Sequence, residues 1–209
     1  MSDAQVTRVV TSGTFSLDGG TWEVDNNVWV IGDDTECVVI DAAHDAGPII
    51  EAIGGRQVQA VLLTHAHDDH ISAAAALCAA TGAPSYLHPG DRVLWDKVYD
   101  EAPDRELADG DTFEVGGVTL LTLHTPGHAP GACCFHSEEL RAVFTGDTLF
   151  HGGPGATGRS FSHFPTIIDS ISVKLLSLPP ETVVRTGHGD DTSIGAERSG
   201  LEAWIARGH

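Results

Sequence analysis

Basic residues are scarce in this 209-residue chain, in which 11 lysines and arginines stand against 30 aspartates and glutamates and give a formal net charge of −19. A field of that sign repels the phosphate backbone of DNA and RNA, so nucleic-acid binding is not expected. Long apolar runs are absent as well. Nothing in the sequence approaches the ~18–20 apolar residues of a membrane-spanning helix, and the start, MSDAQVTRVV, does not resemble a secretory signal. No membrane partner is expected.

Cysteine is also rare. Cys37, Cys78, Cys133 and Cys134 have no CxxC spacing, and two of them are adjacent. This pattern favours buried, reduced thiols over a disulfide framework and therefore predicts a cytoplasmic protein.

Apolar residues make up 41% of the chain, which is enough for a core, and the length favours a single α/β domain over residues 1–209. Apolar periodicity predicts strands at Val6–Thr11, Val28–Ile31, Cys37–Asp41, Ala60–Thr64, Ser85–His88, Val118–Thr125, Ala132–His136, Ala142–Thr145 and Thr182–Arg185. It predicts helices at Gly47–Ile53, Ile71–Ala80, Ile167–Leu178 and Ile194–Ala206. This order fits two packed sheets with outer helices, and it also fits an ordinary three-layer α/β fold.

Histidine is unusually frequent, with 12 residues, and three of them occur in the segment THAHDDH directly after an apolar strand. The pattern HxHxDH can aim His65 and His67 at one point, and Asp69 and His70 at a second point nearby. Imidazole nitrogens and carboxylate oxygens are ligands that Zn²⁺ and similar ions prefer. The alternative, a polar loop at a helix start, does not explain three clustered histidines.

Further candidate ligands follow other predicted strands. His128 ends the segment TPGH, Asp147 lies in TGDT, and His188 lies in TGHG. Each is next to a glycine, which lets the backbone turn sharply at the end of the strand. The remaining seven histidines are expected to be structural or exposed: His44, His88, His124, His136, His151, His163 and His209.

The segments THAHDDH, TPGH, TGDTLF and TGHG, in this order, resemble the glyoxalase II-like branch of the metallo-β-lactamase fold superfamily. The resemblance implies an αββα sandwich of two mixed sheets with helices on the outer faces. It implies two metal sites, one of His65, His67 and His128 and the other of Asp69, His70 and His188, bridged by Asp147. It also makes Asp41 a residue that orients a ligand imidazole, although an ordinary strand-terminal aspartate fits its position equally well. β-Lactamases of this fold lack the bridging aspartate, so antibiotic hydrolysis is not expected.

Two close divalent ions, with zinc expected and iron or manganese as alternatives, can share a water and lower its pKa from about 16 to about 7. The bridging hydroxide, held with Asp69 and Asp147 as catalytic carboxylates, would attack a carbonyl carbon. A thiolate leaves without a general acid, which suits a small thioester. Two alternatives remain: a mononuclear iron persulfide dioxygenase of the same fold using His65, His128 and Asp147, and a non-catalytic metal-binding protein.

The substrate is expected to be an S-acyl or S-formyl adduct of a low-molecular-weight thiol. Family resemblance places Arg159 and Phe161, in the loop GGPGATGRSF, against the thiol carrier. Longer glyoxalase II enzymes grip glutathione with a basic helical domain that has no counterpart after His188, and the chain looks most like short actinobacterial hydrolases. The sequence therefore favours mycothiol esters over S-lactoylglutathione.

Overall fold

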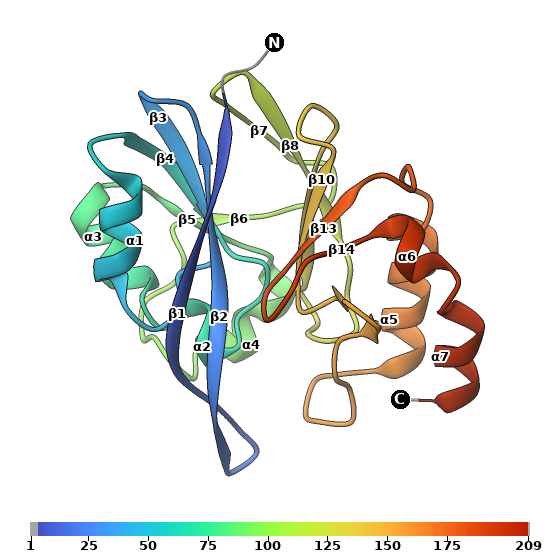
Figure 1. Cartoon of the computed structure of the whole chain (residues 1–209). Helices are drawn as coiled ribbons and strands as arrows, with labels where there is room; N and C mark the ends of the chain where they lie inside the picture. Colours follow the sequence, from blue (N-terminus) through green and yellow to red (C-terminus); the bar gives the residue numbers. More distant parts are fainter. Residues whose placement is uncertain (1–3, 209) are drawn as a thin grey trace.

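The computed structural model describes residues 4–208, which form two six-stranded sheets packed face to face (Figure 1). The first sheet contains, in spatial order, β1 (Gln5–Leu17), β2 (Gly20–Gly32), β3 (Glu36–Ile40), β4 (Gln57–Leu62), β5 (Ser85–Leu87) and β6 (Arg105–Glu106). The second contains β14 (Thr192–Ser193), β13 (Val183–Thr186), β10 (Ala142–Gly146), β9 (Cys133–Ser137), β8 (Val118–His124) and β7 (Thr112–Val115). Both sheets mix parallel and antiparallel pairs, as in β3–β4 and β2–β3, or β10–β13 and β9–β10.

Helices cover the outer face of each sheet, so the predicted αββα sandwich is confirmed. The helices α1 (Ala46–Ile53) and α3 (Ala74–Thr81) lie beyond the first sheet, whereas α5 (Phe164–Ser170), α6 (Ile194–Arg198) and α7 (Leu201–Arg207) lie beyond the second (Figure 1). Shorter elements connect these layers: α2 (Asp68–Ile71), η1 (Pro89–Asp91), α4 (Arg92–Trp95), β11 (Leu149–Phe150), β12 (Gly153–Pro154) and the π-helical turn η2 (Ile171–Leu175).

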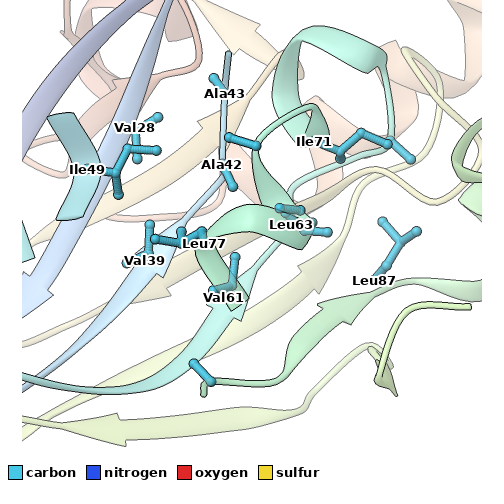
Figure 2. Packing of buried hydrophobic residues seen from close by; sticks show 14 of the residues in the cluster. Val28, Val39, Ala42, Ala43, Ile49, Val61, Leu63, Ile71, Leu77 and Leu87 are labelled. Atoms are coloured by element: carbon cyan, nitrogen blue, oxygen red, sulfur yellow. The ribbon is translucent and has the colours of Figure 1, made fainter. Parts of the chain in front are cut away.

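The core consists of three apolar layers, because both faces of both sheets are covered. In β2, Val28 and Val30 pack toward α1 and α3, whereas Trp29 and Ile31 pack between the two sheets. Figure 2 shows the outer layer, in which Leu77 of α3 meets Val39 and Val61 of the sheet. A strand that is buried on both faces needs apolar side chains at successive positions, which explains the continuous apolar runs in these strands.

Two of the four predicted helices are interrupted in the structure. The helix expected over Ile71–Ala80 is broken at Ser72 and Ala73, because the backbone N–H of Ala73 donates to Ala42 O at 2.9 Å instead of continuing the helix. The segment expected as one helix over Ile194–Ala206 is likewise divided into α6 and α7. The two-residue and edge strands β6, β7, β11, β12 and β14 were not predicted, since such short segments carry little periodicity.

The first two strands are longer than predicted, with 13 residues each, and form a hairpin that extends beyond the sheet (Figure 1). Asp18 and Gly19 close it with φ angles of 53° and 79°, the left-handed pair that tight hairpin turns require. The four cysteines are free and three of them are buried. No helix among residues 4–208 has the length and apolarity needed to span a membrane.

Candidate metal centre

The candidate ligands lie where strands of both sheets end at one edge of the sandwich. The loop after β4 leads through His65 and His67 into α2, and β8, β10 and β13 are followed by the other segments singled out in the sequence. The structure brings all seven predicted ligand side chains together: His65, His67, Asp69, His70, His128, Asp147 and His188. His209 lies outside the described residues.

Three histidines form the first group. Nε2 of His65 and Nε2 of His128 each lie 3.0 Å from Nδ1 of His67. The other ring nitrogen of His128 donates to Ala156 O at 2.8 Å, which leaves its Nε2 lone pair facing the group. The three ligand atoms lie within 4.8 Å of one another and all three side chains are buried.

Asp69, His70 and His188 form the second group. Nε2 of His188 lies 3.3 Å from Nε2 of His70 and 3.3 Å from Oδ2 of Asp69. The Nδ1 atoms point away from the group: that of His70 bonds Asp41 at 2.9 Å, and that of His188 donates to Asp25 O at 2.7 Å. Both imidazoles therefore present Nε2 to the same point.

Asp147 lies between the two groups. Its carboxylate oxygens are 3.2 Å from Nε2 of His70, 3.4 Å from Nε2 of His188 and 3.5 Å from Nε2 of His128. Its Oδ1 atom is buried and makes no hydrogen bond. A Cβ at Gly187 would lie 2.4 Å from this oxygen, so only glycine leaves room for the carboxylate here.

The two groups differ in their proton affinity. Burial and the neighbouring His128 lower the pKa of His67 to about 3, and burial also lowers the pKa of His128. In the second group, burial opposes protonation, yet the carboxylates of Asp147 and Asp69 raise the pKa of His188 to about 10. Burial likewise opposes ionisation of Asp147, but the charges of His188 and His70 hold its pKa well below the ordinary value.

The donor set fits metal ions. It combines five imidazoles with two carboxylates, and three overlapping groups of ligand atoms each lie within 4.8 Å. Nitrogen and carboxylate donors of this kind suit zinc, iron and manganese. A buried carboxylate oxygen without a hydrogen bond is costly in a protein interior, and a cation at this position would satisfy it.

Asp41 supports the second group, in line with the role that the resemblance implied. It adopts φ 63° at the end of β3, and its carboxylate accepts from Thr64 N at 2.8 Å and contacts Nδ1 of His70 at 2.9 Å. A left-handed backbone is unfavourable for aspartate, and the hydrogen bonds of the Asp41 carboxylate hold the residue in this conformation.

Sequence reasoning missed three supporting residues. Asn26 of β2 donates from Nδ2 to Oδ2 of Asp69 at 3.0 Å. Its Oδ1 lies 2.8 Å from Nε2 of His44, a histidine that was predicted to be structural or exposed. Asp68 accepts from Ser16 N at 3.0 Å and so fixes β1 beside the ligands. Asp91 accepts from the backbone N–H of Ala66 at 2.9 Å. The one available signal was Asn26 itself, because asparagine is depleted in strand interiors.

A cavity of about 190 Å³ opens beside the ligands. Phe15 and Val24 of the hairpin, Phe150 of β11 and Arg159 contribute to its wall. Arg159 lines the cavity, whereas Phe161 is absent from the lining residues and packs beneath Lys97, with Nζ 5.4 Å from the ring centroid. The hairpin residues were not predicted to belong to the site.

Comparisons with known proteins agree with this architecture. The chain is 32% identical over 182 residues to the hydroxyacylglutathione hydrolase GloC of Haemophilus influenzae, covering 79% of this chain and 86% of that protein. It is similar in structure to the BLEG-1 B3 metallo-β-lactamase, with a TM-score of 0.77, 30% identity, and coverage of 90% and 97% of the two chains. It is also similar to TTHA1623, solved in a di-iron-bound form, with a TM-score of 0.75, 32% identity and the same coverage.

The family model of the metallo-beta-lactamase superfamily matches residues 21–188, a range that holds all seven clustered ligands. Together with the αββα sandwich and the histidine-rich edge, this match shows that the chain belongs to the metallo-β-lactamase superfamily.

Proposed function

We propose that the chain is a metal-dependent hydrolase that holds two divalent ions, zinc or iron, and cleaves a small thioester. In this proposal His65, His67 and His128 would hold one ion, Asp69, His70 and His188 would hold the other, and Asp147 would serve both. The position of Asp147 carries the proposal, since its carboxylate lies within 3.5 Å of histidines from both groups.

When bound, a pair of such ions lowers the pKa of water and polarises a carbonyl oxygen. The residues of the chain supply the rest. Backbone carbonyls at Ala156 and Asp25 fix which nitrogen of His128 and His188 faces the site. Phe15 and Phe150 give the small cavity an apolar wall. A thiol leaving group with a pKa of about 8.5 departs as thiolate, so no residue needs to donate a proton to it.

The substrate class rests on the relatives and on the cavity. GloC is named a hydroxyacylglutathione hydrolase, and the cavity of about 190 Å³ suits a short acyl group. The two thiol carriers under consideration are mycothiol and glutathione, with Arg159 and Phe161 as proposed contacts. The four free cysteines support the accompanying proposal of a cytoplasmic location.

The mononuclear iron dioxygenase is the less favoured reading. It would use His65, His128 and Asp147 only, and it would give no reason for the clustering of Asp69, His70 and His188. Dinuclear hydrolysis uses every member of both groups.

The test combines metal analysis with a substrate panel. Protein purified without added metal is expected to contain about two ions per chain and to hydrolyse S-lactoylglutathione or a short-acyl mycothiol, with no oxygen uptake on glutathione persulfide. A β-lactam serves as the control for the antibiotic activity implied by the name of BLEG-1. One iron per chain with persulfide-dependent oxygen consumption would replace the hydrolase by the dioxygenase.

A further inference from the structure

The distal part of the β1–β2 hairpin carries an aromatic platform beside the metal centre. Phe15 and Trp22 are cross-strand partners, and their rings stack with centroids 5.7 Å apart and planes at 28°. Gly20 makes room for the indole, because a Cβ there would lie 2.1 Å from a Trp22 ring atom. Phe15 also contacts the ring of His67, with centroids 5.1 Å apart, so the platform is continuous with the site.

Arg159 lies on this platform. Its guanidinium carbon is 3.9 Å from the ring centroid of Trp22 and 5.1 Å from that of Phe15. The loop that carries Arg159 is attached to the hairpin turn, since Ser160 N donates to Asp18 Oδ2 at 3.0 Å. Stacking on the face of an aromatic ring holds a guanidinium by its plane and leaves the N–H groups at its edge free.

These N–H groups have no acidic partner within residues 4–208. Arg159 belongs to none of the ion pairs that lysine and arginine side chains form in the described part of the chain. The hydrogen bond from Ser160 N and, more weakly, the charge of Arg159 lower the pKa of Asp18. The Asp18 carboxylate therefore pairs with the Ser160 backbone and not with the guanidinium. Arg159 is the one lysine or arginine among the residues that line the cavity, in a protein with a net charge of −19. An unpaired, oriented guanidinium matches a carboxylate or phosphate, which it can bind through two parallel hydrogen bonds.

We propose that Phe15 and Trp22 are positioning residues that hold Arg159 for an anionic group, carboxylate or phosphate, on the thiol carrier of the substrate. This inference rests on the proposed thioester hydrolysis and specifies its carrier. It reverses the preference drawn from the sequence, since an uncharged carrier such as mycothiol would leave the guanidinium without a counterion.

The first experiment measures binding without turnover, so its result does not depend on the proposed reaction. Calorimetry on the metal-loaded protein compares S-methylglutathione, which carries carboxylates, S-methyl-coenzyme A, which carries phosphates, and the uncharged S-methyl-N-acetylcysteamine. One charged ligand is expected to bind at least 10-fold more tightly than the uncharged one, and the better of the two identifies the anion. Equal affinity for charged and uncharged ligands would overturn the proposal.

Variants then test the platform. Trp22→Leu removes the stacking face at an exposed position and is expected to weaken binding of the charged ligand about 5-fold, whereas Trp22→Phe restores most of it. Arg159→Ala is expected to weaken binding of the same ligand by about 10- to 100-fold. In the double variant, Trp22→Leu should cause no further loss of affinity. Binding of the uncharged ligand should stay unchanged throughout.

If a thioester of the preferred carrier is hydrolysed, the same variants should raise KM and leave kcat within about 3-fold, the pattern of lost carrier binding. Failure of hydrolysis with an intact charge preference would contradict the proposed function and retain the binding site. An equal loss for charged and uncharged ligands in Trp22→Leu would show a merely structural platform and defeat the inference.

Discussion

Asp91 connects the two loops that carry the first group of histidines. Its carboxylate is fully buried and accepts from Ala66 N at 2.9 Å and from Gly131 N at 2.5 Å. Ala66 lies between two of the histidines in HxHxDH, and Gly131 follows His128 by three residues. Replacing Asp91 with asparagine removes its charge while preserving its size, so the variant tests what this single carboxylate contributes.

The expected effect on stability depends on pH. Burial raises the pKa of Asp91 to about 6, against the opposing hydrogen bonds from Gly131 and Ala66. The difference from the ordinary value of 3.8 corresponds to about 3 kcal/mol. Because the folded pKa is the higher one, the contribution of Asp91 is complete below pH 3.8 and is lost as the pH rises through about 6. Roughly half of this loss falls between pH 5 and pH 7.

Asparagine does not titrate, and its single acceptor oxygen leaves one of the two backbone N–H groups unpaired, at a cost of about 1–3 kcal/mol. At pH 7 the wild type carries a buried charge that the variant avoids, so the two effects nearly cancel. We therefore expect Asp91→Asn to be close to wild type in stability at pH 7 and clearly less stable at pH 5. Loss of the shared anchor should also lower metal affinity by about 10- to 100-fold, as for other residues that support metal ligands.

Urea unfolding of metal-free wild type and variant, measured from pH 5 to pH 8, gives the difference in free energy of unfolding at each pH. The control is Asp104→Asn. Hydrogen bonds from Ser85 lower the pKa of Asp104, so its contribution is present above the ordinary pKa and is lost as the pH falls. Its difference curve should not rise toward pH 5. Parallel stability curves for wild type and Asp91→Asn would refute the reasoning, as would unchanged metal affinity.

Three further predictions concern the metal centre. Asp147→Ala removes the group between the two clusters and should abolish most metal binding, with kcat reduced at least ~100-fold; wild-type metal content in elemental analysis would contradict its bridging role. Asn26→Ala removes the 3.0 Å donor to Asp69 and should weaken binding of one ion about 10-fold while the other stays bound, and titration with a chromophoric chelator separates the two steps. Removal of metal by a chelator should lower Tm and abolish thioester hydrolysis, and zinc or iron should restore both, since a ligand of the folded state stabilises it; a Tm that is independent of metal would argue against the site.

Much of the candidate site could be predicted because each ligand motif is local. A strand followed at once by THAHDDH or TGHG specifies, within a few residues, that imidazoles stand at the end of that strand. The sandwich followed from the order of these motifs through family resemblance, whereas periodicity alone had left a three-layer fold open. The predicted helix boundaries were wrong where tertiary hydrogen bonds override the local preference. At Ala73, for example, the backbone N–H donates to Ala42 O.

Contacts between distant segments could not be predicted from local pattern. The sequence by itself determined which side chains could bind metal, because strand, loop and ligand are adjacent in the chain. Only the packing of the two sheets decided that Asp147 lies between His70 and His128, and that Phe15 and Arg159 meet across the cavity. A contact between residues far apart in sequence depends on the length and register of every strand between them, and no short pattern encodes that geometry.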